Sequence, residues 1–133
     1  MYRPTYELAC FSTVTHDEKL DILVAMLEAL VLANVLYLRH RPATPPLYAS
    51  GVPYVVEPPG RDNWQDIPRS LALGEGDCED LACWRIAELR VRHNENARPH
   101  ITAKKIGNFT LFHIMVRRGD GSIEDPSRIL GKR

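Results

Sequence analysis

The sequence lacks an excess of charge of either sign, because 17 lysine and arginine residues balance 17 aspartate and glutamate residues. Domains that coat nucleic acid are usually strongly basic, so this balance argues against nucleic acid as a partner. With 44% hydrophobic and 26% charged residues, the composition is that of an ordinary soluble globular protein. A chain of 133 residues fits one domain, which we expect to span residues 1–133.

Cysteine is scarce, with only Cys10, Cys78 and Cys83 in the chain. An odd and low count does not fit a disulfide framework, and it is typical of a reducing compartment. We therefore expect a cytoplasmic protein. Cys78 and Cys83 are five positions apart and no second pair follows them, so their spacing does not fit a zinc site. We expect no metal and no cofactor.

The chain also lacks an uninterrupted membrane span and the basic-then-apolar start of a signal peptide. Residues 20–38 are almost wholly apolar, but Asp21, Glu28 and Asn34 interrupt them. Each charge in the middle of a span costs ~2.5–3.5 kcal/mol on insertion. A buried core helix is therefore favoured over a membrane span, which remains the alternative, and no membrane partner is expected.

Two helices are marked by their caps. Thr15 and Glu18 form a capping-box pattern, and the helix that they begin is expected to run to about Arg39. Asp77 is the expected N-cap of a second helix, which runs from Cys78 to about Arg92. Between them, residues 42–76 hold seven of the ten prolines. We predict a loop there, with an edge strand at 54–56 and a turn of helix at 64–70. A short extended segment is expected at 6–11.

The C-terminal part reads as an antiparallel sheet. Strands are predicted at 100–106 and 109–117, joined by a turn at Gly107 and Asn108. The second strand is apolar at alternate positions on both faces, which predicts a central strand buried on both sides. Residues 119–121 form the next hairpin loop, and 122–125 return as a strand. The expected fold class is α+β, with helices packed on a small antiparallel sheet.

Cys78 is the first candidate for chemistry. It opens a helix directly after a glycine-containing approach, where unpaired amides and the helix dipole stabilise a thiolate and an adjacent oxyanion. The alternative is a small buried residue at the start of a core helix. The carboxylates of Asp77, Glu79 and Asp80 would raise the pKa of the thiol unless a cation compensates them.

His113 and Asp125 supply a geometric test. If residues 119–121 form a three-residue loop with Gly121 in the left-handed conformation, Met115 lies opposite Asp125. His113 and Asp125 then share one face as diagonal neighbours, ~7–8 Å apart, where the carboxylate can orient the imidazole. A two-residue turn would shift the register and turn Asp125 to the other face. Taken singly, His113 reads as a core histidine and Asp125 as a turn residue.

Residues 76–82 (GDCEDLA) resemble the nucleophile motif of the bacterial transglutaminase-like superfamily, in which a cysteine opens a helix after a glycine-rich approach. In that family a histidine follows on one strand and an aspartate on the next, and 112–114 and 123–127 match in that order. Through 67–70 (IPRS) and 125–128 (DPSR) the chain is also similar to short members encoded by tailed phages. The resemblance covers about half of the chain. It implies a papain-like fold and a catalytic triad of Cys78, His113 and Asp125.

The sequence departs from the papain-type pattern at one position. Papain-type peptidases place an oxyanion glutamine six positions before the cysteine, where this chain has Ala72. We expect the Cys78 amide as the first oxyanion donor. Candidates for the second are Gln65, Trp64 and Asn63. The calcium-binding insertions of animal transglutaminases have no room in 133 residues, so the resemblance implies no metal.

The sequence thus predicts a cysteine-dependent hydrolase or acyltransferase that acts on a protein or peptide amide, as a peptidase, an amidase or a transglutaminase. The alternative is a non-enzymatic binding or assembly module with the same fold. Such a module would be a phage structural protein that is virion-associated and bound to virion or assembly proteins. The acidic residues around Cys78 and the missing glutamine favour this alternative, whereas the complete triad favours the enzyme.

Overall fold

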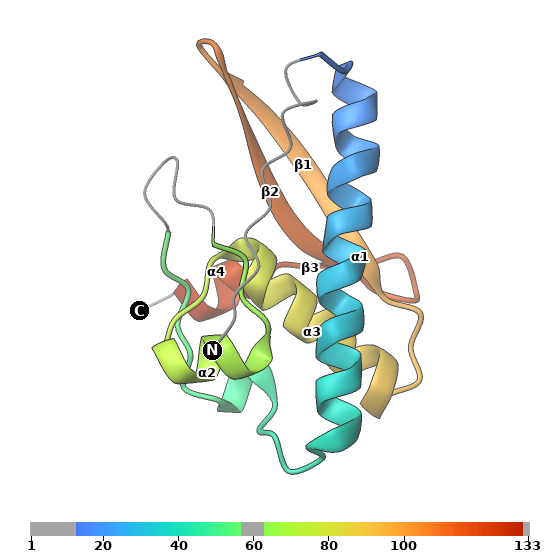
Figure 1. Cartoon of the computed structure of the whole chain (residues 1–133), viewed down its shortest axis with the longest axis vertical. Coiled ribbons are helices and arrows are strands. Elements are labelled where there is room, and N and C mark those ends of the chain that lie inside the picture. The colour runs from blue at the N-terminus through green and yellow to red at the C-terminus, as the bar shows by residue number, and fades with distance from the viewer. Residues whose placement is uncertain (1–12, 57–62, 132–133) are drawn as a thin grey trace.

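The computed structural model describes residues 13–56 and 63–131, and the expected segment at 6–11 lies outside them. Within these residues, α-helices pack on a three-stranded antiparallel sheet of order β1-β2-β3, which confirms the α+β class (Figure 1). The helices are α1 (His16–His40), the 3₁₀ helix η2 (Leu47–Ala49), α2 (Ile67–Leu73), α3 (Cys78–Arg92) and α4 (Pro126–Gly131). The strands are β1 (Arg98–Ile106), β2 (Phe109–Arg117) and β3 (Ile123–Glu124).

Helix α1 begins and ends close to where its sequence predicts. The Glu18 amide donates to Thr15 Oγ1 at 3.2 Å, and the Thr15 amide donates to Glu18 Oε1 at 2.8 Å, so the capping box is confirmed. One face of α1 is buried against α3, while Leu32 and Leu36 on the other face are about half exposed. By length and composition α1 is also apolar enough to cross a membrane, a test that core helices pass too.

Helix α3 is the centre of the fold. Its N-cap is Asp77, with Asp80 completing the capping box, and it packs against both α1 and β2 (Figure 1). Trp84 and Leu81 are fully buried, and Cys83 is buried with them as expected. The start of α3 is therefore held rigidly by core packing, which fixes the position of Cys78.

The sheet has the predicted order of strands but not the predicted burial. Strand β2 is central, yet β3 pairs only with Val116 and Arg117. The far half of the β1–β2 hairpin extends away from α3 beside the upper part of α1 (Figure 1). Leu111 is 58% exposed there, so the expectation of a strand buried on both faces is wrong. Ile114 and Val116 are its buried residues among those described.

The loop between β2 and β3 is the predicted three-residue loop. The Arg118 amide donates to the Ser122 carbonyl at 2.7 Å, and the Gly121 amide donates back to the Arg118 carbonyl at 2.9 Å. Gly121 has a φ of +89°, the positive value that such a loop requires and that glycine adopts without strain. With Val116 paired to Glu124, the register that places His113 and Asp125 on one face is confirmed.

In its described residues, 42–56 and 63–76, the proline-rich segment contains less strand than predicted. The expected edge strand is a single parallel bridge between Tyr54 and Gly76, and the expected helical turn is α2. Asn34 is the polar residue that interrupts the apolar run of α1, and its side-chain oxygen accepts the Ile67 amide at 2.9 Å. This buried hydrogen bond ties the start of α2 to α1.

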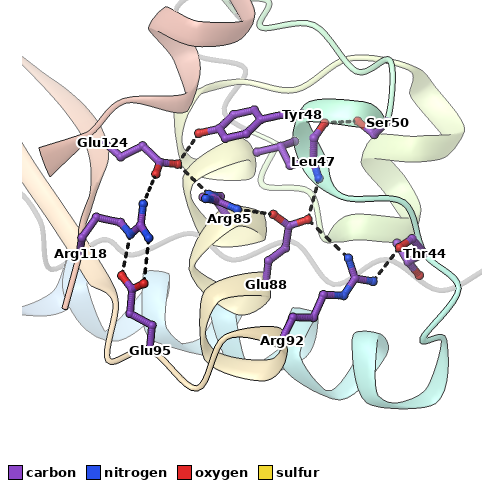
Figure 2. A network of polar contacts seen from close by, with 10 residues as sticks. All are labelled: Thr44, Leu47, Tyr48, Ser50, Arg85, Glu88, Arg92, Glu95, Arg118 and Glu124. Atoms are coloured by element: carbon purple, nitrogen blue, oxygen red, sulfur yellow. Dashed lines mark hydrogen bonds and ion pairs between the residues drawn. The ribbon is translucent and has the colours of Figure 1, made fainter. Parts of the chain in front are cut away.

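A partly buried polar network holds β3 against α3 (Figure 2). Arg85 on α3 donates to Glu124 at 2.7 Å and to Glu88 at 3.1 Å. Glu124 also accepts from Arg118 at 2.8 Å and from the Tyr48 hydroxyl. Because Glu124 directly precedes Asp125, these contacts also fix the position of Asp125 at the end of β3.

Candidate active site

His113 and Asp125 are joined directly, with 2.9 Å between Nε2 and Oδ2. The other oxygen of Asp125 accepts the Ser127 amide at 3.1 Å, so the same carboxylate caps α4. Pro126 occupies the first position of α4, where its fixed φ suits a helix start. A carboxylate can only accept, so this hydrogen bond places a proton on Nε2 and leaves Nδ1 of His113 free to accept one.

Cys78 lies at the start of α3 and is 9% exposed. Its sulfur donates to Glu79 Oε2 at 3.4 Å and lies close enough to the Ile114 backbone amide to be stabilised by it. Ile114 directly follows His113 on β2, so the sulfur lies beside the strand that carries the histidine. Among the described residues no hydrogen bond joins the sulfur to the imidazole.

The surroundings of Cys78 favour the neutral thiol. Burial raises the pKa of Cys78 most, and the adjacent Glu79 carboxylate raises it further. The Ile114 amide lowers this pKa, but it does not offset the other contributions. A thiol in this environment is protonated at neutral pH and needs a base before it can attack.

The amides at the start of α3 are occupied. The Cys78 amide, which we expected to be the first oxyanion donor, donates to Asp77 Oδ1 at 2.7 Å. The Asp77 amide donates to Asp80 Oδ2 at 3.0 Å. The carboxylates that cap the helix thus take up donors that an oxyanion would need, and the Cys78 amide, the expected first oxyanion donor, is engaged by Asp77 in this structure.

Gln65, the first candidate for the second oxyanion donor, is a structural residue here. It is 6% exposed, and its side-chain nitrogen donates to the Glu75 carbonyl at 3.0 Å and to Asp80 Oδ2 at 3.2 Å. Trp64 is partly buried against the core and Asn63 is exposed, and for both the role of oxyanion donor stays a prediction.

Tyr54 is a site residue that no motif in the sequence indicates. Burial, followed by four nearby acidic groups, raises the pKa of Tyr54 to about 12; these groups are Asp77, Cys78, Asp125 and Glu79. The phenol is therefore near enough to Cys78 and Asp125 for both to influence its pKa. The position of Tyr54 near the site depends on its bridge to Gly76. These two residues are 22 positions apart, so no local pattern predicts their pairing.

Three side chains could contribute ligand atoms to a metal ion. Asp77, Cys78 and Glu79 each offer one such atom, and these atoms lie within 4.8 Å of one another. Glu79 Oε1 is buried and has no hydrogen-bond partner among the described residues. Clusters of acidic groups are common without an ion, and the protonation of Glu79 is a simpler response to its burial.

Glu79 predicts a pH dependence of stability. Burial, followed by the charges of Asp80 and Asp77, raises the pKa of Glu79 from 4.5 to about 8. The folded state therefore holds a proton that the unfolded state releases between these values. We expect the free energy of unfolding, measured by urea denaturation, to fall as pH rises from 5 to 8. In Glu79→Gln this decline should disappear, because glutamine does not titrate.

Glu75→Gln is the matched control, since Glu75 is exposed. It should keep the decline of the parent chain. Glu79→Gln should also raise the rate at which iodoacetamide alkylates Cys78 at pH 8, because it removes a negative charge beside the sulfur. An equal pH slope in Glu79→Gln and the parent chain would show that Glu79 is ionised in the folded protein.

Comparisons of the chain with protein-family models, with curated proteins and with solved structures find no match. The resemblance of residues 76–82 to the transglutaminase-like motif therefore remains a prediction, as does a papain-like core. Among the expected site residues, His113 and Asp125 are hydrogen-bonded to each other. Cys78 lies beside Ile114, the residue that follows His113 on β2.

Proposed function

We propose that this chain is a cysteine-dependent acyl-transfer enzyme acting on a protein or peptide amide. Cys78 is the nucleophile, His113 is the base and Asp125 orients His113. The observation that carries the proposal is the 2.9 Å hydrogen bond from His113 Nε2 to Asp125, made beside a cysteine at the start of a buried helix. An imidazole oriented in this way by a carboxylate is the arrangement that activates a nucleophile in catalytic triads.

The reaction begins from the neutral thiol. As the sulfur attacks the substrate carbonyl carbon, its proton passes to Nδ1 of His113, and Asp125 stabilises the imidazolium that forms. The carbonyl oxygen becomes an oxyanion in the tetrahedral intermediate. The C–N bond then breaks, and His113 returns the proton to the leaving amine. The product of this half-reaction is a thioester on Cys78.

The second half-reaction regenerates the enzyme. His113 removes a proton from an incoming water or amine, which attacks the thioester and expels the Cys78 thiolate, and the thiolate then recovers the proton. Water as the acceptor makes the enzyme a peptidase or an amidase, and an amine makes it a transglutaminase. The same three residues serve both outcomes.

The proposal is tested with p-nitrophenyl acetate, an acyl donor that needs no recognition of a peptide. We expect a burst of p-nitrophenol and an acetyl group on the peptide that contains Cys78, read by mass spectrometry. Cys83 is the internal control, because it is fully buried and its sulfur donates to the Leu27 carbonyl at 3.6 Å. A chain that shows no acetylated Cys78 and no burst is not an acyl-transfer enzyme.

The second candidate is a non-enzymatic binding or assembly module, as in a phage particle. Two observations favour it: burial and Glu79 hold the Cys78 thiol in its neutral form, and Asp77 occupies the Cys78 amide. A stably folded protein with an unreactive Cys78 would support this candidate over the enzyme.

A further inference from the structure

Backbone hydrogen bonds hold Tyr54 against Gly76, which lies two residues before Cys78. The Val55 amide donates to the Gly76 carbonyl at 2.9 Å, and the Gly76 amide donates to the Pro53 carbonyl at 3.2 Å. Residues paired in this way point to the same face of the bridge. A Cβ on Gly76 would lie 3.0 Å from Leu81 Cδ2 in the first turn of α3. The side chain of Tyr54 therefore leaves the bridge on the side of that turn.

The ring of Tyr54 also contacts α4. A Cβ on Gly131 would lie 3.2 Å from Tyr54 Cδ2, so the ring packs on the C-terminal end of α4, the helix whose start Asp125 caps. The acidic groups of Cys78 and Asp125 both contribute to the raised pKa of Tyr54, after burial and Asp77. Tyr54 thus lies between the residues that lead into α3, where Cys78 is, and the C-terminal end of α4, the helix that follows Asp125.

The hydroxyl of Tyr54 is available as a donor. Among the described residues it makes no hydrogen bond, whereas the hydroxyl of Tyr48 donates to Glu124. The raised pKa of Tyr54, about 12, keeps its proton in place at neutral pH. The Cys78 amide and the Gln65 side chain are already engaged, so neither is free to stabilise an oxyanion.

We propose that the Tyr54 hydroxyl donates a hydrogen bond to the substrate carbonyl oxygen as Cys78 attacks it. Tyr54 is then the oxyanion donor that the capped start of α3 does not supply. This inference rests on the acyl-transfer function proposed above. It makes Tyr54 a catalytic residue and assigns Gln65 to the structural support of Asp80.

Two reagents separate this role from others. Acylation of Cys78 by p-nitrophenyl acetate passes through an oxyanion, whereas alkylation by iodoacetamide displaces iodide at a saturated carbon and forms none. In Tyr54→Phe we expect acylation to slow by about 10²–10³-fold, the typical effect of losing one oxyanion donor. Alkylation should keep its rate, because the thiol and His113 are untouched.

Tyr37→Phe is the matched control, because Tyr37 lies on α1 and packs against the core away from the start of α3, and it should leave both rates unchanged. Gly131→Ala is an independent variant that keeps the hydroxyl but pushes the ring, since the new Cβ at 3.2 Å from Cδ2 forces a shift of a few tenths of an ångström. It should slow acylation less than Tyr54→Phe does, and it should not change alkylation. If circular dichroism shows that Tyr54→Phe does not fold, Gly131→Ala tests the role of the Tyr54 hydroxyl in its place.

Three outcomes overturn the inference. Equal losses of acylation and alkylation in Tyr54→Phe would show that Tyr54 acts through the thiol. Unchanged acylation in Tyr54→Phe would show that another group binds the oxyanion. A parent chain that iodoacetamide alkylates at Cys78 but p-nitrophenyl acetate never acylates would instead remove the acyl-transfer function itself, so the two failures are distinguishable.

Discussion

Replacing His113 by alanine is expected to slow acylation of Cys78 by p-nitrophenyl acetate by about 10²–10⁴-fold, the range of a positioned acid–base group. The reason is the neutral state of the thiol, whose pKa is raised first by burial and then by Glu79. Without Nδ1 to accept its proton, the sulfur can attack only in the small fraction of molecules that are already ionised. The measurement is the rate of the burst at pH 7.

His100→Ala is the matched control. His100 lies opposite Met115 on β1, so it shares the face of His113, and its ring contacts Arg117 at 3.3 Å. It should leave the burst unchanged. If both variants lose acylation equally, the loss reflects damage to the sheet and not the absence of a base. If neither variant loses it, Cys78 is activated by another group.

Asp125→Asn separates orientation from charge. The asparagine can still cap α4 with its side-chain oxygen, so the fold should survive. An amide that turns its nitrogen toward His113 would favour the wrong tautomer, with Nδ1 protonated and unable to act as a base. We therefore expect a loss similar to that of His113→Ala, while Asp120→Asn in the exposed hairpin loop should have no effect.

The parts of the fold that the sequence predicts well are governed by local chemistry. Thr15 with Glu18 and Asp77 with Asp80 mark the helix starts because each cap is closed by residues three positions apart. The loop at 119–121 is predictable because Gly121 supplies its positive φ, and that loop alone sets the register that joins His113 to Asp125.

The parts that the sequence does not predict depend on distant contacts. Gln65 looks like a donor beside the site, but Asp80, 15 positions away, accepts both its amide and its side chain. Leu111 belongs to an apolar strand yet is exposed, because β3 ends before reaching it. Tyr54 enters the site only through its bridge to Gly76.

The carboxylates at the start of α3 serve stability at the expense of thiol reactivity. Asp77 and Asp80 close the capping box, and Asp80 also holds the chain at Gln65. The same negative charges sit beside Cys78, where the charge of Asp77 adds to that of Glu79 in favouring the neutral thiol. Removing Glu79 alone relieves this conflict without touching a cap, and for this reason Glu79→Gln separates the two effects.

Glu88→Ala is expected to lower the free energy of unfolding by about 3–5 kcal/mol, the usual cost of breaking a buried ion pair. Glu88 is 1% exposed and accepts from the Leu47 amide at 2.6 Å and from Arg85 at 3.1 Å (Figure 2). Alanine leaves that amide without its acceptor and Arg85 without one of its two carboxylate partners. Urea denaturation of the variant and the parent chain measures the difference.

The control is Glu28→Ala, which removes the partner of Arg90 at an ion pair with a 2.9 Å contact, whose side chains are 29% and 39% exposed. Exposed pairs contribute about 0–1 kcal/mol, so this variant should remain close to the parent chain. If both variants lose equal stability, the burial of Glu88 does not matter and water replaces its contacts. If Glu88→Ala alone is strongly destabilised, acylation should fall with it, because Arg85 also fixes Glu124 beside Asp125.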